Sequence, residues 1–155
     1  SVKVGATLGE IVDTLKKIRK RMAFPHKEVK TIISFLFPGS AHKGRGAFKS
    51  AFLVRSRAKA LALKTANPKH IARDMRIYEK LPRTLRNRYF AKIYWNSKYC
   101  LLQKYGKAAK VPKETLEDLR RFAKGHGLTD VRPDNVRKVD GRFKIVDANI
   151  SKRRK

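Results

Sequence analysis

Acidic residues are scarce in this chain, and four of the 12 lie between positions 130 and 147. Asp130 and Asn135 stand in a predicted loop, and Asp147 follows the apolar end of the next predicted hairpin. Carboxylate and amide oxygens at the two ends of a hairpin converge on one spot, and they suit a hard cation such as Mg²⁺ that is shared with phosphate groups. The spacing predicts a metal site formed by Asn135 and Asp147, whereas Asp140 is interpreted as a turn residue.

The hairpin that would position these residues is predicted from its turn. Residues 136–139 and 142–146 have the pattern of strands, and they flank Asp140-Gly141, a pair typical of two-residue hairpin turns. Upstream, apolar residues at helical spacing predict a helix that begins near Pro112 and ends near Gly125.

Two helices are predicted at the start of the sequence. Residues 7–10 read Thr-Leu-Gly-Glu, which is a capping box, and apolar residues then recur at helical spacing to about Met22. A second helix is predicted between Pro25 and the stop signal Pro38-Gly39. We expect residues 1–38 to be a helical pair that packs on the rest of the fold, because its apolar stripes need a partner.

Short strands dominate the middle of the sequence. Residues 40–63 predict a short strand, a glycine-bearing loop and two further strands. Pro68 opens a predicted helix that ends near Pro82, and residues 89–95 and 99–103 have the pattern of a strand pair. The expected fold class is α+β, with a mainly antiparallel sheet of about five strands and one packed helix.

Four motifs, in the same order, resemble those of the protein kinase-like superfamily. Asp130 and Asn135 match the catalytic-loop pattern Asp-x-x-x-x-Asn, and Asp147 resembles the metal-binding aspartate that follows a strand. Upstream, Gly44-Arg45-Gly46-Ala47-Phe48 resembles the glycine-rich phosphate loop, and Leu61-Ala62-Leu63-Lys64 is similar to the Val-Ala-Ile-Lys strand. The resemblance extends over residues 40–149 and is closer to compact atypical kinases, such as the Rio kinases, the tRNA-modification-complex kinases and the aminoglycoside phosphotransferases.

The resemblance implies ATP and Mg²⁺ as cofactors and a role for each matching residue. Lys64 would hold the α- and β-phosphates, Asn135 and Asp147 would hold the metal, and Asp130 would orient the hydroxyl that accepts the phosphoryl group. Lys64 would be fixed by a helix carboxylate, for which Asp74, on the apolar face of its predicted helix, is preferred to Glu79. The implied function is that of an ATP-dependent kinase, a phosphotransferase with an unknown acceptor.

The resemblance also implies where ATP would lie. Gly44, Gly46 and Phe48 would cover the phosphates, and the segment from Gln103 to Tyr105 would be the hinge that bonds adenine through its backbone. The sequence departs from the family pattern around the catalytic loop, where Leu128-Thr129 precedes Asp130, and after Asp147, where Ala148-Asn149 follows.

The resemblance gives a domain organisation as well. Eight residues follow Asp147, which implies a truncated second lobe of one helix and a β-hairpin. The expected organisation is a helical extension over 1–38, a minimal kinase-like domain over 39–150 and a basic tail over 151–155.

The chain has an excess of positive charge, because 40 Lys and Arg residues stand against 12 Asp and Glu residues, for a net charge of +28. Such an excess attracts polyanions, so RNA or DNA is an expected partner. The alternative function is a basic nucleic-acid-binding module, ribosome- or RNA-associated, on a catalytically inactive kinase-like scaffold. Aromatic residues between 89 and 105 alternate with Lys and Arg and could stack bases, although core packing is favoured for them. The residues expected to bind the polyanion are Lys16, Lys17, Arg19, Lys20, Arg21, Lys152, Arg153, Arg154 and Lys155.

Several classes of function are disfavoured by the same sequence. Its longest apolar stretch, residues 32–37, is far too short to span a bilayer, and its start lacks the features of a secretory signal. Cys100 has no partner for an intramolecular disulfide, so a reducing, cytoplasmic location is expected. The four His residues are scattered without acids or Cys at ligand spacing, which argues against a zinc site.

Overall fold

The arrangement of these elements is given by a computed structural model, which describes residues 6–18, 26–45, 49–57 and 59–150. The chain divides into two units. The first unit comprises Ser1–Ala72 and Ile93–Tyr105, and the second comprises Arg73–Lys92 and Gly106–Lys155.

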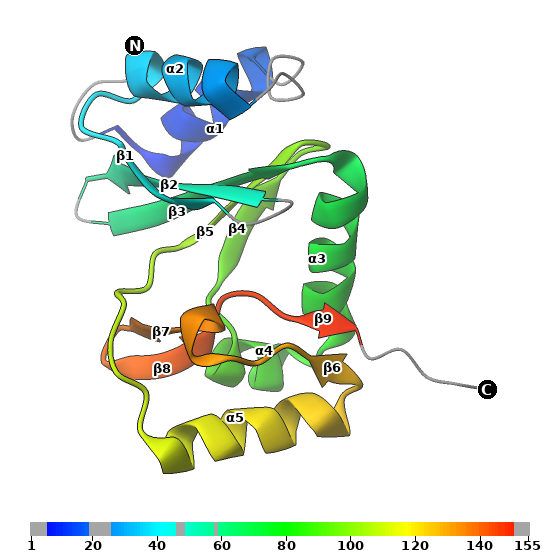
Figure 1. Cartoon of the computed structure of the whole chain (residues 1–155). Coiled ribbons are helices and arrows are strands. Elements are labelled where there is room, and N and C mark those ends of the chain that lie inside the picture. Colours follow the sequence, from blue (N-terminus) through cyan, green and yellow to red (C-terminus); the bar gives the residue numbers. More distant parts are fainter. Residues whose placement is uncertain (1–5, 19–25, 46–48, 58, 151–155) are drawn as a thin grey trace. The chain divides into compact units, whose positions relative to one another are not determined.

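The first unit contains one antiparallel sheet with the strand order β1-β2-β3-β5-β4 (Figure 1). The prediction of an α+β fold with an antiparallel sheet is confirmed. The predicted strand over 89–95 is wrong in its first half, because a helix ends at Tyr89 and the strand begins only at Ile93. The strands are β1 (Ala41–Arg45), β2 (Lys49–Ser56), β3 (Lys59–Ala66), β4 (Ile93–Asn96) and β5 (Cys100–Lys104).

Helices α1 (Leu8–Lys17) and α2 (His26–Leu36) precede the sheet. The predicted capping box is present: the Thr7 hydroxyl oxygen accepts from the Glu10 amide at 3.1 Å, and the Glu10 carboxylate accepts from the Thr7 amide at 3.2 Å. Helix α1 ends at Lys17, whereas the sequence predicted an end near Met22; residues 19–25 lie outside the described part of the chain.

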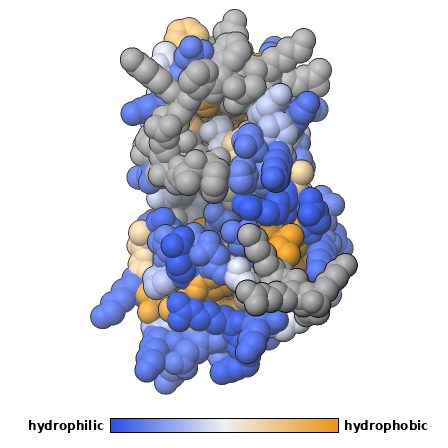
Figure 2. Space-filling view, turned by 45° about the vertical axis from the view of Figure 1, so that its right-hand side comes forward, coloured by the Kyte–Doolittle hydropathy of each residue, from blue (hydrophilic) through white to orange (hydrophobic). Residues whose placement is uncertain are grey.

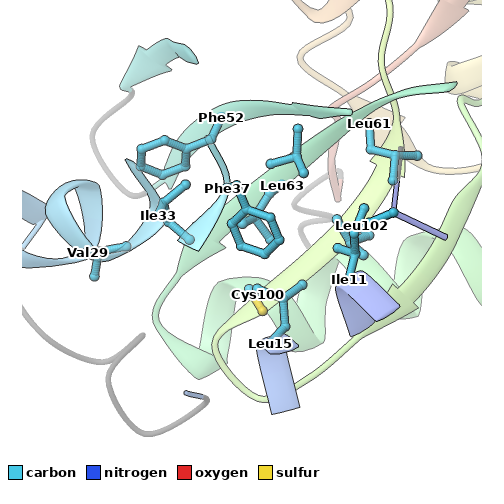
Figure 3. Close-up of a cluster of buried hydrophobic side chains, with 12 residues drawn as sticks. Ile11, Leu15, Val29, Ile33, Phe37, Phe52, Leu61, Leu63, Cys100 and Leu102 are labelled. Atoms are coloured by element: carbon cyan, nitrogen blue, oxygen red, sulfur yellow. The ribbon is translucent and has the colours of Figure 1, made fainter. Parts of the chain in front are cut away.

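The helical pair packs on one face of the sheet, and Figure 3 shows side chains of both helices and of the strands in one buried cluster. Ile11 and Leu15 of α1 and Ile33 of α2 have no exposed surface, and they belong to the same buried cluster as Leu63 of β3 and Leu102 of β5. Burial of this apolar surface is the main contribution that holds α1 and α2 on the sheet. The predicted packing of the helical pair is confirmed.

Cys100 of β5 belongs to the same buried cluster. Burial raises the pKa of its thiol to about 11, against the opposing effect of a contact of 3.2 Å with the Ser97 hydroxyl. The thiol is therefore protonated at neutral pH.

We expect Leu15→Ala to lower the free energy of unfolding of the first unit by about 2–5 kcal/mol, because it leaves a cavity in a fully buried cluster. Lys16→Ala, on the exposed side of the same helix, is the matched control and should change it by less than about 0.5 kcal/mol. Urea unfolding can be followed by the fluorescence of Trp95, the single tryptophan, which packs against this cluster. Equal midpoints for the two variants would show that α1 does not contribute to the core.

The second unit contains most of helix α3 (Pro68–Lys80) and the helices α4 (Arg83–Tyr89) and α5 (Lys113–Gly125). The predicted hairpin is confirmed as β7 (Val136–Val139) and β8 (Arg142–Ile145). Its turn residues Asp140 and Gly141 have positive φ angles of 49° and 79°, as a primed two-residue turn requires. The sequence did not predict α4, nor the pairing of two short strands, β6 (Leu128–Thr129) and β9 (Asn149–Ile150).

The buried residues of the second unit join its helices to its hairpin. Phe90 forms a parallel bridge with Ile145, and the Ala91 amide donates to the Ile145 carbonyl at 3.0 Å. Tyr78 of α3 meets Phe90 edge to face, with ring centroids 6.5 Å apart. These contacts anchor the strand that precedes Asp147. No helix among the described residues is long and apolar enough to cross a membrane.

Candidate functional site

The loop from Asp130 to Asn135 is held in shape by its own hydrogen bonds. Asp130 has a φ angle of +66°, and its carbonyl accepts from the Asn135 side-chain amide at 2.8 Å and from the Arg132 amide at 3.0 Å. The Arg132 guanidinium lies 2.9 Å from the Asp130 carboxylate and 3.7 Å from that of Asp134. The carboxylate of Asp130 is thus oriented by a charged neighbour.

The same loop is bonded to the segment that carries Asp147. The Asn135 carbonyl accepts from the Val146 amide at 2.9 Å, one residue before Asp147. On the other side of Asp147, Asn149 of β9 pairs with Thr129 of β6. The structure therefore joins the loop of Asp130 and Asn135 to the segment of Asp147, and all three residues belong to one unit. That Asn135 and Asp147 form one metal site stays a prediction.

The donor atoms available here fit a magnesium ion. The amide nitrogen of Asn135 is engaged with the Asp130 carbonyl, which leaves the side-chain oxygen as the atom that can face a cation. The described residues contain no group of three or more His, Cys, Asp or Glu that could hold a metal without help. One amide oxygen and one carboxylate suit Mg²⁺, which keeps several waters and takes further oxygens from phosphates.

Lys64 lies in β3 of the first unit. It pairs with Ala51 of β2 and Leu101 of β5, and it is half-buried. Leu61 and Leu63 are buried under the helical pair, so strand alternation places Lys64 and Ala62 on the other face of the sheet. Lys64 is thus directed away from the hydrophobic core.

The expected hinge begins inside β5. Gln103 pairs with Ala62 on one side and Ile93 on the other, and its side chain is 2% exposed. The Tyr105 amide donates to the Ala60 carbonyl at 3.1 Å. At the next residue, Gly106, a Cβ atom would lie 2.4 Å from the Cβ of Arg137, so this close approach requires glycine.

The remaining predicted residues are placed only in part. Gly44 lies in β1 opposite Ala51, next to an irregularity in the pairing, while Gly46 and Phe48 lie outside the described residues. Asp74 is half-buried and Glu79 is exposed in the part of α3 that belongs to the second unit. Because Lys64 belongs to the first unit, its ion pair with Asp74 stays a prediction.

The residues predicted to bind a polyanion are described only at Lys16 and Lys17, which are exposed at the end of α1. Positions 19–21 and 152–155 lie outside the described residues. Hydrophilic residues cover most of the coloured surface in Figure 2, with small apolar areas between them. This agrees with the charge of the chain but does not define a nucleic-acid site.

Arg132 is a residue of the site that the sequence did not single out. It contacts the carboxylates of both Asp130 and Asp134, and more than half of its side chain is exposed. The only feature of the sequence that could have indicated Arg132 is its position between two acids, Asp130 and Asp134, in the same loop.

Comparisons with known proteins identify the fold. No family model and no curated protein matches the chain. Among solved structures, the kinase PK-1 of the Cydia pomonella granulovirus has a TM-score of 0.50 at 13% identity, with 81% of this chain and 60% of that chain covered.

Two further kinase structures match less well. A kinase domain has a TM-score of 0.46 at 14% identity, over 74% of this chain and 51% of that one. The Rad53 structure in complex with AMP-PNP has a TM-score of 0.45 at 16% identity, over 80% of this chain and 43% of that one. This chain therefore spans about 60% or less of the kinases it resembles.

The fold is that of a protein kinase-like protein. The match to the granulovirus kinase supports this statement, and at such low identity it concerns the fold alone. The resemblance seen in the sequence is thereby confirmed at the level of the kinase-like fold, without distinguishing the Rio or aminoglycoside types.

Proposed function

We propose that this protein binds ATP with Mg²⁺ and transfers a phosphoryl group to an acceptor hydroxyl. The observation that carries the proposal is the bonding of the Asp130–Asn135 loop to the segment of Asp147, through the Asn135 carbonyl and the Val146 amide. This arrangement gathers a candidate acceptor-orienting carboxylate and two candidate metal ligands in one unit. In this proposal residues 39–150 are the minimal kinase-like domain, and residues 1–38 are its helical extension.

Phosphoryl transfer needs positioning and neutralisation of charge more than covalent chemistry. Asn135 and Asp147 would hold Mg²⁺, which when bound neutralises charge on the phosphates. Asp130 would orient the acceptor hydroxyl, and its contact with Arg132 supports this role because the contact fixes the carboxylate. Lys64 would hold the α- and β-phosphates, with Asp74 to orient it.

The first test is whether ATP with Mg²⁺ raises the melting temperature and whether the protein labels itself or an added acceptor. Ligand that binds the folded state at 100 times its Kd stabilises it by about 2.7 kcal/mol, so the shift is measurable. No shift at millimolar ATP and Mg²⁺ would contradict the proposal.

We expect Lys64→Met to weaken ATP binding about tenfold or more, because a charge-assisted contact to phosphate is lost. The domain should stay folded, since Lys64 is on the sheet face away from the core cluster. Lys59→Met, at an exposed position at the start of the same strand, is the matched control and should bind ATP like the parent. Calorimetric titration measures both. Equal affinities for the two variants would show that Lys64 does not face the nucleotide.

A second candidate function is a nucleic-acid-binding module on an inactive kinase-like scaffold. The net charge of +28 favours it. The scaffold hypothesis predicts salt-dependent binding of RNA or DNA together with no effect of ATP on the melting temperature.

A further inference from the structure

The second unit has an open pocket of about 710 Å³ between α4, α5 and β8. All its lining residues belong to this unit, and Asp130, Asn135 and Asp147 are not among them. The pocket is therefore distinct from the proposed phosphoryl-transfer residues. Its volume lies within the range usual for pockets that bind small organic groups.

The walls of the pocket are tied together. The Lys144 ammonium of β8 donates to the Asn87 carbonyl in the last turn of α4 at 2.6 Å. Tyr89 of α4 stacks on Phe122 of α5, with ring centroids 4.0 Å apart and an angle of 17° between the planes. These two contacts hold α4 to β8 and to α5, so the pocket does not depend on loops.

Tyr89 and Arg88 lie together in the α4 part of the pocket lining. Phe122 occupies one face of the Tyr89 ring, and the guanidinium of Arg88 lies over that ring at 5.2 Å from its centroid. Arg88 is exposed, so another flat group can reach its guanidinium. Phe143 adds a second, half-buried ring to the lining.

The polar groups of the lining favour an anion. Arg88 and Arg142 are exposed cations in the lining, and the one acid, Asp118, already pairs with Arg121 at 2.9 Å. Asn87 adds an amide that can both donate and accept. The pocket thus presents flat apolar surfaces, two guanidinium groups and a few groups that can bond the edge of a base.

We propose that this pocket binds a segment of single-stranded polynucleotide. A base stacks against the plane of Arg88 or the ring of Phe143, and the flanking phosphates contact Arg88 and Arg142. The edge of the base bonds Asn87. An acidic peptide would use the two cations, but it would leave the flat surfaces of Arg88 and Phe143 without a role.

The experiment is a titration of a fluorescent 12-nucleotide single-stranded RNA at several salt concentrations. We expect Arg88→Gln combined with Arg142→Gln to weaken binding about tenfold or more and to lower the slope of log affinity against log salt by about 1–2. The matched control combines Arg76→Gln with Lys110→Gln, two exposed cations of the same unit outside the lining. It removes the same charge and should weaken binding less than threefold.

A second variant separates stacking from charge. Phe143→Leu should weaken RNA binding about fivefold or more while leaving the salt slope unchanged, because only a ring is lost. Lys64→Met should leave RNA binding unchanged, so a failure of this proposal is distinguishable from a failure of the ATP proposal.

Hydrogen exchange of the unmodified protein, with and without RNA, tests the same site without relying on variants that could fold poorly. Saturating RNA should protect amides of α4 and β8 more than those of the first unit. The proposal is overturned if the two double variants bind RNA equally, if protection maps to the first unit alone, or if an acidic peptide of the same charge displaces the RNA at equal concentration.

Discussion

Asp130→Asn is expected to lower the rate of phosphoryl transfer by about 10²–10⁴ while leaving the affinity for ATP and Mg²⁺ nearly unchanged. An interaction with the acceptor hydroxyl in the transition state lowers kcat when it is lost, and it contributes little to nucleotide binding. Asparagine is suited to this position, because Asp130 has a φ angle of +66° and asparagine tolerates that region. The loop should therefore keep its shape.

The control for this variant is Asp134→Asn in the same loop. Asp134 is 68% exposed, and its distance of 3.7 Å from Arg132 is long for an ion pair. Loss of its charge should therefore change the transfer rate less than twofold. A radiolabel transfer assay, run beside calorimetric titration with a non-hydrolysable ATP analogue, measures both quantities. Transfer by Asp130→Asn at the rate of the parent would exclude Asp130 as the acceptor-orienting residue.

Asp147→Asn is expected to reduce ATP affinity in the presence of Mg²⁺ to the level measured in a chelator. The variant removes the only charged ligand in the proposed site, and Mg²⁺ strongly prefers carboxylate oxygen. The neighbouring backbone should stay in place, because Val146 is bonded to Asn135 and Asn149 is paired with Thr129.

Asp140→Asn is the matched control for Asp147→Asn. Asp140 is the exposed turn residue of the same hairpin, with a φ angle of 49° that asparagine also adopts. It should bind ATP with Mg²⁺ like the parent in the same titration. If Asp147→Asn also keeps metal-dependent binding, and the parent transfers no phosphate, the protein is a scaffold without catalysis.

The local elements of the fold could be predicted because each has a signal in adjacent residues. The capping box at Thr7 and the turn at Asp140 are examples, and both are present. Helix α4 could not be predicted, because none of its residues is buried and it has no apolar stripe. The two residues each of β6 and β9 are too few to show alternation.

The candidate site was predictable to the extent that it is local in sequence. Asp130, Asn135 and Asp147 lie within one hairpin and its flanks, so the turn at Asp140 is enough to bring their segments together. The role of Lys64 is not local in the same sense, because Lys64 belongs to the first unit and Asp74 to the second, and their ion pair stays a prediction. The pocket of α4, α5 and β8 was also missed, since it depends on the unpredicted helix α4.

The burial of Cys100 makes its thiol a probe for local opening of the first unit. Alkylating reagents react with the thiolate form of cysteine. While β5 is packed against the helical pair, the raised pKa of Cys100 disfavours its thiolate, and the surrounding side chains exclude the reagent. The rate of alkylation therefore reports how often β5 separates from the helical pair. Cys100 is the single cysteine of the chain, and it is buried. A new cysteine at an exposed position could therefore be labelled selectively while Cys100 stays in place.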